Sequence, residues 1–281
     1  MEPLIGWISG RYTKRTGKPD PAEEIKRFAM HTKGLPFSLY RTHRSLSMQA
    51  SYAAASDIGA HHAAAWLVKV DLLGAFPTFQ DKAAALITYP RVRLGNDNLG
   101  LCKLPWVDVF NPASGEMKNT DIYINPASQE IYADFYNGML GTDMTWQEIF
   151  ARTDRDINLQ RVMNAMVFGR ETRNRDWIPE RAIGPTDDAL YDAEKDYHDR
   201  EISRIAVKPL TEVQTMSSSE KRKILMDHRK NELSELIQAY YEKRGWLSSG
   251  IPSVQTLQQL GLWQYLSEEA QTGVINLNGD S

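Results

Sequence analysis

The residue with the most distinctive chemistry in this chain is its single cysteine, Cys102, within the segment Asp97-Asn98-Leu99-Gly100-Leu101-Cys102-Lys103. One thiol can form neither an intrachain disulfide nor a whole iron–sulfur cluster, which normally takes four thiolates. Cys102 is therefore either one ligand of a group that other residues also hold, or a buried thiol that packs as a small apolar side chain.

Two adjacent histidines, His61 and His62, form a second group with catalytic chemistry. Consecutive side chains on a helix point about 100° apart, so both imidazoles cannot face one metal. One of them could donate a hydrogen bond or transfer a proton, because the pKa of imidazole lies near neutrality. The alternative is that one histidine is a core residue and the other faces a neighbouring helix.

The elements that must position these residues lie in the first half of the chain. An alanine-rich segment, 51–73, surrounds the histidines and predicts a buried helix. A short helix is predicted over 81–89 and should end before Pro90, because proline restricts the residue that precedes it. Segment 97–103 would then be a loop, and polar residues 33–46 predict an extended loop.

The second half of the chain predicts helices almost throughout. Thr145 with Glu148, and Ser217 with Glu220, have the spacing of capping boxes that begin helices, and Gly245 is placed to end the second of these. Strand-like alternation is nearly absent, so we expect an all-α fold. The helices predicted outside 51–89 are 22–30, 127–138, 146–153, 157–168, a long helix from 217 to 245, and a final short helix from 253 to about 260.

The composition excludes several classes of protein. The chain has 33 basic and 36 acidic residues. Because these charges nearly balance, there is no strong positive potential that would favour binding to nucleic acid or to an anionic membrane. No apolar run approaches the ~20 residues of a membrane span. The first residues lack the basic and apolar regions of a secretory signal. With one cysteine, a reducing cytoplasm is the expected setting.

Asp97-x-x-Gly100-Leu101-Cys102 resembles the second pterin- and cluster-binding signature of the tungsten-containing aldehyde:ferredoxin oxidoreductases. Other motifs similar to that family occur in the expected order, and the resemblance spans roughly residues 29–265. In one motif, Pro36 replaces an acidic residue of the family. These motifs are Lys33-Gly34-Leu35, Ser51-Tyr52-Ala53, Asp57 to His62, Asn158-x-x-Arg161, Arg170 to Pro179, Tyr240-Tyr241-x-x-Arg244-Gly245-Trp246, Gly250-Ile251-Pro252 and Leu260-Gly261-Leu262.

The resemblance implies roles for the signature residues. Cys102 would be the fourth ligand of a [4Fe–4S] cluster, and Asp97 would accept hydrogen bonds from the N–H groups of a pterin. Gly100 would let the backbone approach the cofactor, with Leu101 beside it. Lys103 could hydrogen-bond both a pterin and a cluster sulfide. The alternatives are that Asp97 caps a turn and that Lys103 is solvated.

The resemblance also assigns His62 to the neighbourhood of tungsten, as a proton donor or acceptor, and leaves the role of His61 open. Other polar residues have structural interpretations. Arg91 and Arg93 are expected to form surface ion pairs, and Asp57 to accept a local hydrogen bond.

By resemblance, the chain is the C-terminal part of a tungstopterin, iron–sulfur enzyme that oxidises aldehydes to carboxylates and passes electrons to ferredoxin. Residues 1–32 would be the remnant of a middle helical domain, and residues 33–281 the C-terminal helical domain. The chain would be a fragment, a truncated reading frame or one half of a split enzyme. The tungsten-bis-pterin and the [4Fe–4S] cluster would need further ligands from a second polypeptide carrying the N-terminal domains. The isolated chain is therefore expected to be inactive.

Two alternatives stay open at this point. The chain could be a fragment of a catalytic subunit similar to tungsten benzoyl-CoA reductase. It could also be a non-catalytic helical interaction domain without cofactor, in which case its alanine-rich surface would be exposed and would favour association.

Overall fold

The computed structural model describes residues 14–16, 29–37, 44–57, 67, 71, 74, 78–101 and 126–279. These residues are mostly helical, which confirms the predicted all-α class, and the strands among them form one two-stranded sheet. The elements are β1 (His31–Thr32), β2 (Leu35–Pro36), α3 (Leu46–Ala50), the π-helix η1 (Ser51–Ala55), α5 (Phe79–Asn98), α6 (Pro126–Leu140), α7 (Trp146–Ala151), α8 (Thr153–Phe168), the 3₁₀ helix η4 (Gly169–Glu171), α9 (Thr172–Arg175), α10 (Glu180–Ile183), α11 (Asp188–Ala193), α12 (Lys195–Ile205), α13 (Leu210–Thr215), α14 (Ser218–Arg244), α15 (Val254–Gln259), the 3₁₀ helix η5 (Trp263–Tyr265) and α16 (Glu268–Asn278).

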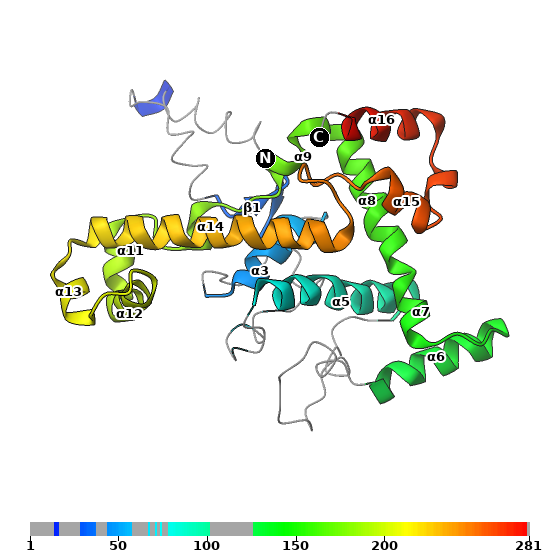
Figure 1. Cartoon of the computed structure of the whole chain (residues 1–281), viewed down its shortest axis with the longest axis horizontal. Coiled ribbons are helices and arrows are strands. Elements are labelled where there is room, and N and C mark those ends of the chain that lie inside the picture. The colour runs from blue at the N-terminus through cyan, green and yellow to red at the C-terminus, as the bar shows by residue number, and fades with distance from the viewer. Residues whose placement is uncertain are drawn as a thin grey trace.

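Helix α14 is the central support of the described structure (Figure 1). Ser217 and Glu220 form the predicted capping box at its start, and Gly245 ends it in the left-handed conformation with φ 67°. Helix α5 packs along α14, while α11 to α13 gather at its N-terminal end. Buried apolar side chains of α14 bind these neighbours together; they are Leu225, Leu233, Leu236, Ile237, Tyr240 and Tyr241.

Helix α5 corrects the prediction that a helix ends before Pro90, and it includes Asp97 and Asn98 of the loop predicted over 97–103. The helix runs from Phe79 through Pro90 to Asn98. An internal proline removes one backbone hydrogen bond and costs about 3 kcal/mol. Burial of the residues around Pro90 against α14, α7 and α8 outweighs that cost, because each large buried apolar side chain contributes about 1.5–3 kcal/mol.

Segment 29–37 contains a hairpin, whose turn and second strand occupy the start of the extended loop predicted over 33–46. Thr32 pairs with Leu35, and His31 pairs with Pro36. The two turn residues, Lys33 and Gly34, have φ of 52° and 79°. Positive φ at both positions is typical of the tight turns that join two antiparallel strands. The turn was missed because lysine is uncommon at the first of these positions.

The predicted alanine-rich helix begins earlier than expected. Ser45 caps α3, and the chain continues directly into η1, which ends at Ala55. The predicted helix is wrong at Ser56, Asp57 and Leu67, which are described and not helical. The rest of segment 51–73, including His61 and His62, lies largely outside the described residues. Of the predicted helix 22–30, only residues 29 and 30 are described, and they are not helical.

The predicted helices of the second half are confirmed, with shifts of a few residues at their ends. Helices α9, α10, α13 and α16 were not predicted, and for α11 and α12 only a solvated helix face near 187–196 was expected, because most of these helices are short and α12 is strongly polar. They are nevertheless packed: α15, α16 and α8 share a small core, and α11 to α14 share another. None of the described helices combines the length and the apolar character that a membrane crossing needs.

Candidate functional site

The structure describes three of the predicted site residues. Asp97 lies in the last turn of α5, and Gly100 and Leu101 follow directly after the helix. Cys102, Lys103 and His62 lie outside the described residues, as does His61. Their proposed roles therefore stay predictions.

The described part of the signature ends helix α5 with a glycine cap. The Leu101 amide donates to the Asn96 carbonyl oxygen at 2.8 Å, and the Gly100 amide donates to the Asp97 carbonyl oxygen at 2.9 Å. This pair of bonds is a Schellman motif, which needs a left-handed residue after the helix. Gly100 provides it, with φ 71°. The Asp-x-x-Gly-Leu spacing therefore has a structural reason of its own.

The cap leaves its side chains facing outward. Asp97 is exposed, and Leu101 is 40 % exposed, which is unusual for a leucine next to a buried helix. A β-carbon added to Gly100 would have no described atom within 4 Å. The helix end is thus fixed in backbone conformation, and among the described residues no atom approaches Gly100 on its outer side.

Beneath this helix end lies Arg93, which corrects a prediction. Arg93 was expected to pair at the surface, but it is 1 % exposed. Its burial lowers the pKa of the guanidinium to about 10, and the nearby Asp97 carboxylate opposes that shift. Arg91 does form a partly exposed ion pair, with Asp154 of α8.

Asp154 also binds Arg244 at the end of α14. One carboxylate therefore joins α5, α8 and α14 below the signature. On the next turn of α8, Asn158 accepts a hydrogen bond from the Trp246 indole at 2.8 Å and donates one to the Asp154 carbonyl oxygen at 2.7 Å. These contacts fix the orientation of α5, and therefore the position of its C-terminal end.

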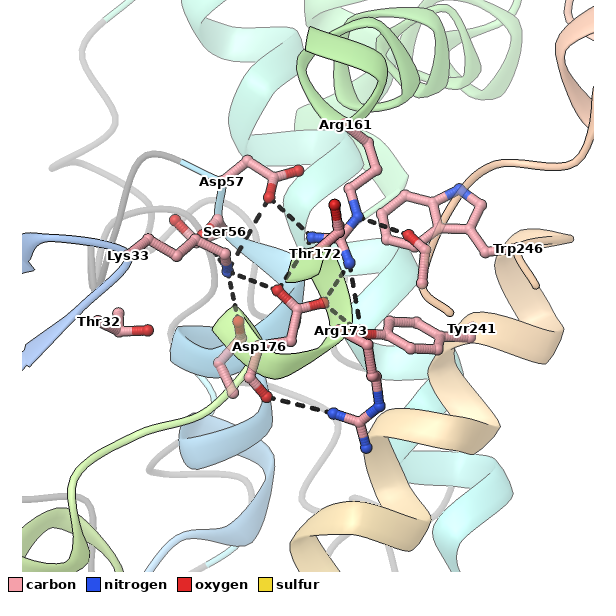
Figure 2. Close-up of polar contacts among 12 residues, drawn as sticks. Thr32, Lys33, Ser56, Asp57, Arg161, Thr172, Arg173, Asp176, Tyr241 and Trp246 are labelled. Atoms are coloured by element: carbon pink, nitrogen blue, oxygen red, sulfur yellow. Dashed lines mark hydrogen bonds and ion pairs between the residues drawn. The ribbon is translucent and has the colours of Figure 1, made fainter. Parts of the chain in front are cut away.

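A second polar cluster is buried deeper, and we call it the charge network (Figure 2). It consists of Lys33, Asp57, Arg161, Asp176 and Tyr241. These residues come from the β1–β2 turn, the end of η1, α8, the segment after α9, and α14. The side chains of the four charged members are between 0 and 6 % exposed.

Arg161 and Asp176 form the centre of the charge network. The guanidinium donates to both carboxylate oxygens, and the Nη1–Oδ1 distance is 3.0 Å. Arg161 also donates to Asp57 at 3.0 Å and to the carbonyl oxygen of Gly250 at 2.6 Å. Tyr241 donates its hydroxyl to Asp176. Asp57 was predicted to be a local acceptor; it is an acceptor, but its partner is 104 residues away in sequence.

Lys33 completes the charge network from the β1–β2 turn. Its ammonium lies 3.1 Å from Asp176 and 3.9 Å from Asp57. The same ammonium donates to the carbonyl oxygens of Ala53 and Ser56 at the end of η1. Two cations and two carboxylates therefore balance in a region closed to water.

The charges shift one another's ionisation. Burial would raise the pKa of Asp176, but the Lys33 ammonium and the Arg161 guanidinium outweigh it and hold that pKa below its usual value. Burial, together with the adjacent Asp176 carboxylate, raises the pKa of Tyr241 well above its usual value. The Asp176–Arg161 pair is therefore ionised, and the Tyr241 phenol beside it is neutral.

The charge network fixes the chain immediately before the predicted histidine segment. Asp57 is held by Arg161 and Lys33, and the preceding carbonyl groups are held by Lys33. Residues 58–66, which include His62, begin at that anchored point. The arrangement is suited to positioning and not to turnover, because its members already satisfy one another.

Sequence reasoning identified Lys33, Asp57 and Arg161 only as parts of similar motifs, and did not identify Asp176 or Tyr241 as site residues. Asp176 and Tyr241 do fall within motif segments, so charged or hydroxyl residues in those segments were the available signal. Among the described residues, no group of three histidine, cysteine or carboxylate side chains is arranged to hold a metal ion.

Comparison with known proteins adds one finding. The family model described as aldehyde ferredoxin oxidoreductase, domains 2 and 3, matches residues 9–262. No curated protein matches the chain. The matched range includes the signature, the histidine segment and every member of the charge network.

Proposed function

The chain belongs to the aldehyde ferredoxin oxidoreductase family, and on that premise we propose that it forms the helical part of a tungstopterin, iron–sulfur oxidoreductase. The proposed reaction oxidises an aldehyde to a carboxylate and passes two electrons to ferredoxin. The observation that carries the proposal is the end of α5, where Asp97, Gly100 and Leu101 are rigidly held yet face outward.

The described residues fit a pterin at this helix end. An exposed carboxylate such as Asp97 suits the N–H groups of a pterin ring, because charge-assisted hydrogen bonds are short and strong. The open space next to Gly100 allows close approach of a flat group to the backbone. Leu101 offers an apolar surface beside it. In this proposal Asp97 would hydrogen-bond the N–H groups of the pterin, and Gly100 and Leu101 would line its site.

We assign the remaining roles to residues outside the described part of the chain. Cys102 is the proposed thiolate ligand of a [4Fe–4S] cluster, and Lys103 is the proposed cation between pterin and cluster. His62 is proposed to hold or transfer the proton at the aldehyde. When bound, the tungstopterin supplies the oxygen transfer and the two-electron redox chemistry, as cofactors generally do.

The charge network supports this proposal because it could position the segment that carries His62. It fixes Asp57 at the start of the segment that carries His62, while the contacts of Asp154 fix the helix that carries Asp97. Both supports converge on α8 and α14. This supports the proposal that α8 and α14 position both predicted parts of the site.

The matched description covers domains 2 and 3, so we propose that the family's first domain and the other three cluster thiolates come from a second polypeptide. A reducing cytoplasm is the proposed setting, because thiolates persist there.

Co-expression tests the proposal. The chain is purified alone and together with the polypeptide encoded next to it, and iron and tungsten are measured by elemental analysis. We expect both metals only in the co-purified complex, and loss of iron in the complex that carries Cys102→Ser, with unchanged helical circular dichroism. Metal in neither preparation would favour the non-catalytic interaction domain. Full iron content in the Cys102→Ser complex would contradict the assignment of Cys102 as a cluster ligand.

The substrate is tested in the same complex. Aldehyde-dependent reduction of a viologen dye supports the proposed reaction. Activity with an aromatic coenzyme A thioester and none with aldehydes would instead support the benzoyl-CoA reductase-like alternative.

A further inference from the structure

A polar hollow lies on the side of α14 that faces α12 and α3. Its volume is about 410 Å³, and its lining includes Arg44, Tyr197, Arg200, Glu201, Arg204 and Arg229. Four arginines line it, against two carboxylates, Glu201 and Glu232. The hollow therefore carries an excess of positive charge in a chain whose net charge is −3.

Two of the arginines are already paired. Arg229 binds Glu201 with two parallel hydrogen bonds of 3.0 and 2.7 Å and donates to the Ile183 carbonyl oxygen at 3.0 Å. Arg44 lies 3.2 Å from Glu194, and its guanidinium stacks over the Tyr197 ring at 4.2 Å from the ring centroid. Both guanidinium groups are held in place by these contacts.

The other two arginines have no carboxylate partner among the described residues. Arg200 donates to the Asp196 carbonyl oxygen at 3.1 Å, so its charge is not neutralised. The Arg204 side chain has neither a hydrogen bond nor an ion pair to any residue that the structure describes. They are four residues apart on α12, so they lie on the same face, one turn from each other.

Two like charges at this spacing destabilise a helix by a few tenths of a kcal/mol. An anion that bridges them would reverse the sign of that interaction. Arginine forks match the oxygens of phosphate, which carries about −1.5 to −2 charges near neutral pH. We propose that this hollow binds the phosphate group of a small phosphorylated molecule, with Arg200 and Arg204 as its two ligands.

The surroundings fit a small ligand. The volume lies within the ~300–1,000 Å³ range of small-molecule sites. Arg44 and Arg229 are already paired with Glu194 and Glu201, so Arg200 and Arg204 are the lining arginines left to bind an anion. The proposal is independent of the cofactor chemistry proposed above, because no member of the hollow belongs to the signature or to the charge network.

Thermal unfolding of the full chain tests the proposal. Inorganic phosphate and glycerol 3-phosphate are titrated at constant ionic strength, with sodium chloride and sodium acetate as the other arms. A ligand that binds only the folded chain raises the Tm with its concentration and saturates. We expect saturable stabilisation by both phosphates, and none by chloride or acetate. Stabilisation by inorganic phosphate but not by the ester would identify the free anion as the ligand.

Variants locate the effect. Arg200→Gln and Arg204→Gln should each weaken phosphate binding at least about tenfold, since a hydrogen bond to a charged group contributes about 1.5–3 kcal/mol. Arg152→Gln is the matched control: it removes the same charge from an exposed side chain at the end of α7, away from α12 (Figure 1). Equal stabilisation of all four proteins, or equal loss in Arg152→Gln, would overturn the proposal. An equal response to acetate would also overturn it, because carboxylate recognition would then suffice.

Discussion

Arg161 and Asp176 face each other through two hydrogen bonds, with both side chains fully buried. Arg161 lies on α8, and Asp176 follows α9, so the pair closes the turn between them. Lys33 and Asp57 then attach the N-terminal hairpin and the end of η1 to this pair. One ion pair therefore connects segments that lie between residues 33 and 250 of the chain.

Replacing Asp176 with asparagine should destabilise the fold strongly. The change leaves Arg161 and Lys33 buried with one carboxylate between them, and removing one partner of a buried pair costs about 3–5 kcal/mol. Urea unfolding followed by circular dichroism measures the loss. Asp227→Asn is the control, because Asp227 forms an exposed pair with Lys223 and its loss should change little. Similar midpoints for the two variants would show that the charge network contributes no special stability.

Acid should weaken the fold through the same carboxylate. The pKa of Asp176 is held below its usual value in the folded state, so the unfolded chain binds more protons as the pH falls. The contribution is complete above the unfolded pKa of about 3.9, and is lost as the pH falls through the folded pKa. Unfolding free energies measured between about pH 6 and pH 3 should therefore decrease, and decrease less steeply in Asp176→Asn. Parallel curves would contradict the assignment.

Gly250 is predicted to be required by the charge network. Its φ is 76°, and an added β-carbon would meet the Arg161 guanidinium and the Tyr241 hydroxyl. Gly250→Ala should lower the unfolding free energy by at least about 2 kcal/mol, from left-handed strain and displacement of Arg161. Gly138→Ala, within α6 and with open space around it, should instead raise it by up to ~1 kcal/mol. Opposite signs in thermal melts are the expected result.

Gly100→Ala separates the two roles of the signature glycine. In the chain alone the change should cost only about 1–2 kcal/mol, because φ is 71° but no described atom obstructs the new methyl group. In the assembled complex the same methyl group should also reduce tungsten content, measured per mole of protein. Unchanged tungsten content would mean that Gly100 serves the helix cap alone.

His62→Ala should abolish most turnover while the metals stay bound. Loss of a proton-transferring group typically lowers kcat about 10²–10⁴-fold. His61→Ala is the companion variant, since the neighbouring side chain points about 100° away on a helix. Normal kcat in His62→Ala would make this histidine a packing residue.

Local signals were the parts of this fold that sequence could predict. Both capping boxes and the Gly245 cap act within four residues, so their spacing alone indicated them. Pro90 was misread because the local cost of a proline is visible in the sequence, whereas the burial that offsets it comes from α14.

In the candidate site too, the sequence indicated residues that lie close together in the chain, and it missed pairs that are far apart. Asp97 and Gly100 were found through a short motif, and the cap explains why they are spaced so. The partners of Asp176 are Lys33, Arg161 and Tyr241, up to 143 positions away (176 − 33). Nothing within one segment indicates such pairings, and only a fold brings them together.

The electroneutrality of the charge network has a consequence for how related sequences diverge. The net charge of the buried network is zero, from Lys33, Asp57, Arg161 and Asp176. A substitution that removes one of these charges therefore leaves an opposite charge buried without a partner. Related sequences that lack Lys33 should therefore also lack one of the two aspartates, Asp57 or Asp176. Such paired replacements would show that the charges of the network change together in evolution.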